Sequence, residues 1–158
     1  MSDYHKLISL FYLIFYLFFF SCTHRPEVTD EWPDGTPQRS EKILKSGHSV
    51  EYSYYPNGKL EFKATYFNDM LDGKSEYWDE NGHLKSVSTY SAEKLHGLWL
   101  QYKTDDRVIH SVEYFHGQKH GLEIWYWDNG QKKSEQRFEF DHPATDIRRW
   151  DSGGKPMN

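Results

Sequence analysis

Residues 71–78 read LDGKSEYW, and the same skeleton returns as LHGLWLQY at 95–102 and as HGLEIWY at 120–126. Each copy has a glycine, then four residues of varying type, then a large aromatic residue. The step from one copy to the next is 24 residues. Self-similarity at a fixed step of about 20 to 50 residues is the sequence signature of a repeat architecture. Much of the chain is therefore expected to consist of short units that stack on one another.

The 24-residue period aligns five columns of similar residues between positions 47 and 158. The columns are the turn pairs Asn57-Gly58, Asn81-Gly82, Asp105-Asp106, Asn129-Gly130 and Gly153-Gly154; the aliphatic residues Leu60, Leu84 and Val108; the aromatic residues Tyr66, Tyr90, Tyr114 and Phe138; the glycines Gly73, Gly97 and Gly121; and the aromatic residues Trp78, Tyr102, Tyr126 and Trp150, preceded by Tyr54. In a stacked array, each column becomes a row of equivalent side chains.

Each repeat is predicted to be one strand–turn–strand unit. Asn-Gly between β-rich segments favours a hairpin with a type I′ turn, in which both central residues have positive φ. Residues 60–66 alternate apolar and polar side chains, as a strand does. The periodic glycines are expected to hold a backbone conformation that a Cβ would hinder. The predicted fold class is all-β, an elongated antiparallel meander of stacked β-hairpins with about nine strands.

The segments YYPNGKLEFKATYFNDMLDG, YWDENGHLKSVSTYSAEKLHG and YWDNGQKKSEQRF resemble the bacterial variant of the MORN repeat. Many proteins of this YwqK-like family are labelled antitoxin components of toxin–antitoxin systems. The resemblance covers roughly residues 52–155 and implies β-hairpin repeats with a binding or scaffolding role and no catalytic residues. We assign residues 47–158 to this repeat domain.

The N-terminus carries an export-type segment, because residues 7–20 form an apolar run in which Ser9 is the only clearly polar residue. The only cysteine, Cys22, follows this run, and FFSC resembles the lipobox of bacterial lipoproteins. We predict a signal peptide at 1–21, a lipidated Cys22 and a flexible tether over 22–46. The protein would then be a membrane-anchored lipoprotein of the cell envelope. An uncleaved signal anchor and a free thiol left by ordinary signal-peptide cleavage are the alternatives.

The net charge of -5 argues against nucleic acid as a partner, because such binding depends on clustered Lys and Arg. It argues equally against an electrostatic grip on anionic lipid head groups. His96, His116 and His120 are candidate metal ligands, since Asp72, His96 and His120 occupy one repeat column and stacking could bring imidazole and carboxylate groups together. We read them as polar turn residues instead, so no metal and no cofactor are predicted. No nucleophile elbow, phosphate loop or dinucleotide fingerprint is present in the sequence, and we predict that the protein is not an enzyme.

The candidate binding residues are Trp99, Trp125 and Trp127. Strand alternation places them opposite the even-numbered residues of their strands, so we expect them to be the more exposed set. The expected structural set is Leu98, Leu100, Tyr102, Leu122, Ile124 and Tyr126.

The predicted function is a membrane-anchored, non-catalytic module that binds or scaffolds a protein partner. Two alternatives stay open: an antitoxin or immunity protein that neutralises a cognate toxin, and a module that binds cell-envelope glycans through its tryptophans. Unpaired end strands also make pairing between copies of the chain plausible.

Overall fold

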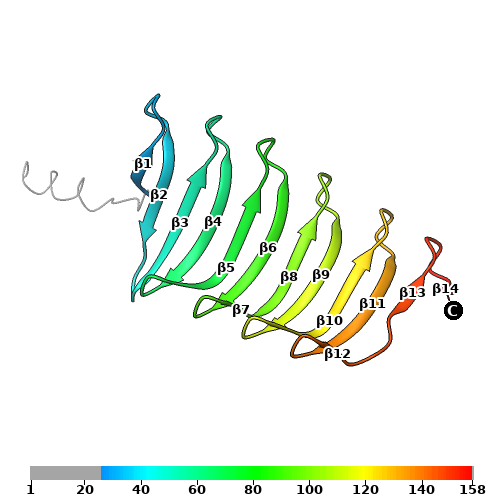
Figure 1. Cartoon of the computed structure of the whole chain (residues 1–158). Helices are drawn as coiled ribbons and strands as arrows, with labels where there is room; N and C mark the ends of the chain where they lie inside the picture. The colour runs from blue at the N-terminus through cyan, green and yellow to red at the C-terminus, as the bar shows by residue number, and fades with distance from the viewer. Residues whose placement is uncertain (1–25, 158) are drawn as a thin grey trace, which may run out of the picture.

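The computed structural model describes residues 26–157 and consists of one open antiparallel sheet that meanders from hairpin to hairpin (Figure 1). The predicted fold class is confirmed. The strands are β1 (Glu27–Glu31), β2 (Pro37–Ile43), β3 (His48–Tyr54), β4 (Leu60–Phe67), β5 (Met70–Trp78), β6 (Leu84–Ser91), β7 (Lys94–Leu95), β8 (Gly97–Tyr102), β9 (Val108–Phe115), β10 (Gln118–Tyr126), β11 (Lys132–Glu139), β12 (His142–Pro143), β13 (Arg148–Trp150) and β14 (Pro156–Met157). The short strands β7 and β12 lie beside the main path and pair with β6 and β11.

The first hairpin, β1–β2, corrects the prediction of a flexible tether over 22–46. Residues 27–43 form two strands, and β2 pairs with β3, so the sheet begins about 20 residues earlier than the repeat domain assigned at 47–158. The turn between them, WPDGT at 32–36, has the same backbone hydrogen bonds as the later turns: Trp32 N to Thr36 O and Gly35 N to Trp32 O, both 2.8 Å. Its Asp-Gly pair lies 23 rather than 24 residues before Asn57-Gly58. This offset hides it from a strict 24-residue alignment.

The Asn-Gly turns differ from the predicted type I′. In the turn at Tyr55, the Gly58 N–H donates to the Tyr55 carbonyl at 2.8 Å, and only Gly58 has positive φ, at 78°. A tight turn followed by one left-handed residue defines the three-residue hairpin loop with a G1 bulge. Pro56 suits this loop because its ring fixes φ near −65° at the first central position. The six loops of this kind lie along one edge of the sheet, which we call the bulge edge; they cover residues 32–36, 55–59, 79–83, 103–107, 127–131 and 151–155.

Pairs of positive-φ residues occur at the opposite edge of the sheet. These pairs are Ser46-Gly47, Asn68-Asp69, Ala92-Glu93, His116-Gly117 and Phe140-Asp141. Two consecutive left-handed residues define the type I′ turn, whose twist matches that of the flanking strands. The two turn types therefore occupy separate edges, as the upper and lower rows of turns in Figure 1 show.

The periodic glycines have the role that the sequence predicted. Gly121 has a φ of 122°, and a Cβ built on it would lie 2.8 Å from the Glu113 Cβ. Gly73 has a φ of 108°, with the Thr65 Cβ 3.2 Å from such an atom. A side chain at these positions would therefore strain the backbone and crowd a side chain of the neighbouring strand.

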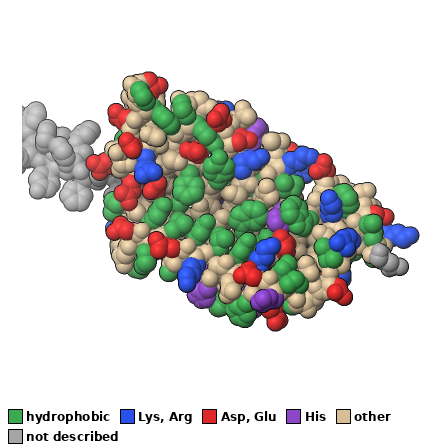
Figure 2. Space-filling model, viewed as in Figure 1, with side chains coloured by type: hydrophobic (Ala, Val, Ile, Leu, Met, Phe, Trp, Pro, Cys, Tyr) green, Lys and Arg blue, Asp and Glu red, His purple; other side chains and the backbone are tan. Residues whose placement is uncertain are grey.

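The sheet has two faces and no second layer among the described residues. Cross-strand register places the columns of Tyr66 and Tyr54 on opposite sides, and we call these the Tyr66 face and the Tyr54 face. Within residues 26–157, Ala64 and Val112 are the only buried hydrophobic residues. Apolar side chains instead form a band across the sheet, visible in Figure 2, and each repeat covers part of the next. Such an array depends on contacts between neighbours rather than on a central core.

Candidate functional site

Trp99 and Trp125 come together on the Tyr66 face, on either side of His110. His110 lies directly across from Gln101 in β8 and from Trp125 in β10, while Trp99 and Glu123 both face Val112. Trp127 lies apart from this group, in the bulge-edge turn after β10. The structure therefore unites two of the three predicted binding residues.

His110 forms the base of this group and is only 7% exposed. Its ring stacks on Trp125 with centroids 3.6 Å apart and 12° between planes, and it meets Trp99 edge-on at 5.2 Å. Sequence reasoning missed His110. No periodic signal marks His110, because the 24-residue period aligns it with Phe62, Ser86 and Ser134, which share no residue type.

Two charged groups complete the cluster. The His110 Nε2 lies 2.8 Å from the Glu123 Oε1, and the Lys119 Nζ lies 2.9 Å from the Glu123 Oε2. Burial lowers the pKa of His110, more than Glu123 raises it. Burial acts to raise the pKa of Glu123, but the hydrogen bonds from Lys119 and His110 outweigh it and lower that pKa overall. The neutral ring therefore donates from Nε2 to an ionised carboxylate.

Exposure follows strand alternation only in part. Trp125 is 43% exposed, as expected, but Trp99 and Trp127 are half-buried. Leu98, expected in the structural set, is 44% exposed. The alternation rule fails here because both faces of a single-layer sheet meet solvent, so neither parity corresponds to an interior.

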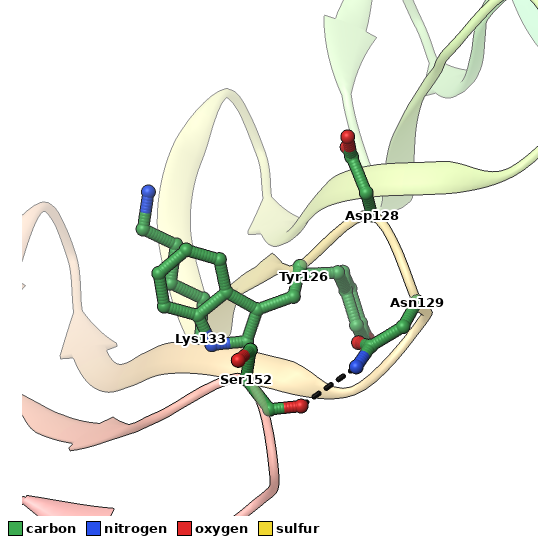
Figure 3. Close-up of a pocket in the computed structure, with 6 residues that line it drawn as sticks. Tyr126, Asp128, Asn129, Lys133 and Ser152 are labelled. Carbon is green, nitrogen blue, oxygen red and sulfur yellow. Dashed lines mark hydrogen bonds between the residues drawn. The ribbon is translucent and has the colours of Figure 1, made fainter.

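Trp127 lines a pocket of about 430 Å³ at the bulge edge, between the turns at 127–131 and 151–155 (Figure 3). The Trp127 Nε1 donates to the Trp150 carbonyl at 3.0 Å, and the Lys133 Nζ lies 4.6 Å from the Trp127 ring centroid. The Asn129 Nδ2 donates to the Ser152 carbonyl at 2.6 Å. The Lys133 ammonium thus lies over the Trp127 ring as a cation–π pair at the wall of the pocket. The remaining lining residues are Tyr126 and Asp128.

The histidines of the predicted turn positions gather at the type I′ edge. The His96 and His116 ring centroids lie 5.0 Å apart, and both rings contact Phe115. Asp72 is engaged elsewhere, since its Oδ2 accepts the Ala92 N–H at 3.0 Å. Within residues 26–157, no three potential ligands converge on a point that could hold a metal ion. These side chains pack as aromatic rings at this edge.

The predicted signal peptide at 1–21 and the lipidation site Cys22 lie outside the described residues. Within the described range, no helix is suited to crossing a bilayer.

Comparison with curated proteins finds no match to this chain. Three segments, residues 48–68, 71–92 and 119–139, match the family model described as MORN repeat variant. Each segment corresponds to one hairpin of the sheet, namely β3–β4, β5–β6 and β10–β11. The hairpin between the second and third matches has lost its turn glycine, with Asp106 in its place. The chain therefore has three segments similar to the MORN repeat variant, set within a longer array of hairpins that share their turns and register.

Proposed function

We propose that the protein is a membrane-anchored, non-catalytic module that binds a protein partner through the Tyr66 face, centred on Trp125. MORN repeats generally serve as modules that interact with proteins or membranes, and they are typically non-enzymatic. The observation that carries the proposal is the support beneath Trp125: an exposed indole rests on the buried His110 ring, which Glu123 holds in place. A rigid, half-exposed aromatic residue loses little entropy on binding and is typical of interface hot spots.

The test is cross-linking in cells with the mature protein tagged at Asn158. Trp125→Ala is expected to lose the captured partner. Leu98→Ala is the matched control, because Leu98 is equally exposed but lies on the Tyr54 face. Equal capture by both variants and the parent would contradict a binding centre at Trp125.

The anchoring half of the proposal depends on Cys22, the only cysteine in the chain. Metabolic labelling with a fatty acid is expected to mark the protein and to fail in Cys22→Ser. A protein that stays soluble after membrane fractionation and carries no label would refute the anchor while leaving the binding surface untouched.

A second candidate function, glycan binding, is favoured by the pocket at Trp127. The Trp127 indole offers a sugar ring an apolar surface, and Lys133, which lies over that indole in the structure, would pair with a carboxylate on an acidic sugar of the cell envelope. Retention on peptidoglycan or an acidic polysaccharide should then be lost in Trp127→Ala and kept in Trp125→Ala. Loss in Trp125→Ala alone would assign any sugar binding to the Tyr66 face instead.

A further inference from the structure

Asn-Gly pairs occupy equivalent positions in three turns of the bulge edge, at Asn57, Asn81 and Asn129. All three asparagines are exposed, and each following glycine has positive φ and donates its N–H to the carbonyl of the first residue of its turn at 2.8 Å. An asparagine side chain reacts most readily with the main chain when glycine follows, because glycine has no Cβ to hinder the approach. Backbone and solvent access are alike at the three sites, so any difference in reactivity comes from the side chains.

Two of the three carboxamide groups are held at both ends. The Asn57 Oδ1 accepts the Lys59 N–H at 3.0 Å, and the Asn57 Nδ2 donates to the Glu80 carbonyl of the next turn at 2.9 Å. Asn129 repeats both contacts, with the N–H two residues on at 3.1 Å and with the Ser152 carbonyl at 2.6 Å (Figure 3). Each of these side chains joins its own turn to the next one, and it must lose two hydrogen bonds before it can rotate.

Within residues 26–157, the Asn81 side chain has neither contact. Its turn begins with Asp79, where the other two turns begin with an aromatic residue. The Asp79 Oδ1 accepts the N–H groups of Asn81 at 2.9 Å and of His83 at 3.0 Å, so it takes the bond that the asparagine side chain accepts elsewhere. The His83 N–H also lowers the pKa of the Asp79 carboxyl, which makes this acceptor a carboxylate. The Asn81 carboxamide is therefore free to rotate in solvent.

We propose that Asn81 is a site of spontaneous deamidation in the folded protein, whereas Asn57 and Asn129 are protected by their hydrogen bonds to the next turn. The Gly82 nitrogen loses its proton and bonds to the Asn81 Cγ, the Cγ–Nδ2 bond breaks, and ammonia leaves with that proton. The succinimide ring that results takes up one water molecule, which breaks either C–N bond of the imide and gives isoaspartate or aspartate. Solvent water is the only co-reactant in this balance.

The product changes the middle of the bulge edge. Isoaspartate and aspartate each add one negative charge to a turn that already carries Asp79 and Glu80. The Asn81 carbonyl accepts the Lys59 Nζ of the preceding turn at 2.9 Å. In isoaspartate the carbon of this carbonyl becomes a free carboxylate, and the main chain passes through the side chain and is one carbon longer. A longer loop no longer matches the G1 bulge, so deamidation is expected to loosen this turn.

The test follows the three sites in the purified full-length protein during incubation at mildly alkaline pH. Trypsin places the asparagines on separate peptides, 46–59, 75–85 and 120–132, so mass spectrometry of one sample reports each rate. We expect Asn81 to deamidate roughly tenfold faster than Asn57 or Asn129, because two hydrogen bonds hold each of the other side chains. In urea the three rates should converge, since the contacts that distinguish the sites are lost.

Asp79→Tyr restores an aromatic residue at the start of the turn and should slow Asn81 towards the rate of Asn57. Glu80→Gln is the matched control, because it removes a negative charge from the same turn and keeps the Asp79 contacts, so its Asn81 rate should equal that of the parent. Unchanged rates at Asn57 and Asn129 show that both variants are folded. Equal native rates at the three sites would overturn the proposal, as would an excess at Asn81 that persists in urea. Deamidation of Asp79→Tyr at the parent rate would overturn the role of Asp79.

Discussion

At the scale of single residues, the cluster around His110 shows how a sheet without an interior still buries an ionisable group. The ring is covered by Trp125 on one side and approached by Trp99 on another, and its Nε2 faces Glu123. The alternation of β10 predicted that Trp125 would be exposed. It could not predict His110, because which side chains cover a given position depends on packing across three strands. The exposure predicted for Trp127 was wrong for another reason: Trp127 lies beyond the end of β10, in the bulge-edge turn, where strand alternation no longer applies.

Protonation of His110 should destabilise the sheet. Its pKa is lowered from 6.5 in the folded protein, so its contribution to stability is fully present above about pH 6.5 and is lost as the pH falls through that value towards the folded pKa. Glu123, whose pKa is also lowered from 4.5, remains ionised over this window. Urea unfolding between pH 8 and about pH 5.5 should show a smaller loss of stability in His110→Gln than in the parent. Parallel pH profiles for the two proteins would contradict this prediction.

Gly121→Ala should destabilise the fold more than Gly58→Ala. Both glycines have positive φ, which alone costs about 1 kcal/mol for alanine. Gly58 has open space around it, whereas an added Cβ at Gly121 would overlap Glu113, so we expect a total of about 2–4 kcal/mol there. Chemical denaturation of the two variants measures the difference. Equal losses would show that Glu113 moves aside without cost.

At the scale of elements, the two kinds of turn give the hairpins different connections on the two edges. On the bulge edge, side chains in one turn donate to carbonyls of the next repeat: Trp32 to Tyr54 at 3.3 Å, Tyr55 to Trp78 at 2.8 Å and Trp127 to Trp150. The 24-residue period predicted the hairpins and their order. It could not assign the turn types, because Asn-Gly fits both a type I′ turn and a G1 bulge, and two-residue turns such as Ala92-Glu93 lack the usual residues.

The first hairpin should be ordered in solution. Asp34 organises its turn, since the Asp34 Oδ1 accepts the Thr36 N–H at 2.9 Å and the Thr36 hydroxyl at 2.6 Å. These bonds lower the pKa of Asp34. Amide hydrogen exchange should show protection over residues 37–43, and Asp34→Ala should speed exchange over 27–43 while leaving β9 and β10 unchanged. Unprotected amides throughout 27–43 in the parent would restore the flexible tether.

Trp127→Phe should loosen the last hairpin. The change removes the donor to the Trp150 carbonyl, and a lost hydrogen bond of this kind costs about 1 kcal/mol. Hydrogen exchange over residues 148–157 is expected to accelerate, because β13 has only the short strand β14 beyond it. Trp125→Phe, with no hydrogen bond from its indole in the structure, serves as the control. Equal acceleration in both would point to lost ring volume as the cause.

At the scale of the whole molecule, stability is divided among neighbouring repeats, because all the extensive contacts between described strands join strands that lie side by side. The two ends are the exposed β1 and the short β14. Charged side chains on β1 are a common way to discourage sheet extension, and pairing between copies of the chain through these ends stays a prediction. The extended all-β array could be predicted from the sequence. The chain has one fixed period of strand-like segments and no further hydrophobic pattern that would predict a second layer packed on the sheet.

Deleting one whole repeat should leave a shorter folded sheet. Removal of residues 79–102 joins Trp78 to Lys103, the residue equivalent to Asp79, and preserves strand direction and register. We expect a cooperative transition whose m-value is lower by about one sixth, since two of twelve strands on the main path are lost. Deleting half a repeat, residues 79–90, is the control, because it reverses the direction of every later strand. Similar stability of the two deletions would contradict a fixed register.

The constant 24-residue step also makes the sheet a ruler. Neighbouring strands lie about 4.8 Å apart, so each repeat adds about 9.6 Å to the distance between the first and last hairpins. Gain or loss of a repeat would move whatever binds one end relative to the other by that fixed increment, without altering either binding surface. A family of such chains could therefore set the spacing between an anchored end and a bound partner by copy number alone.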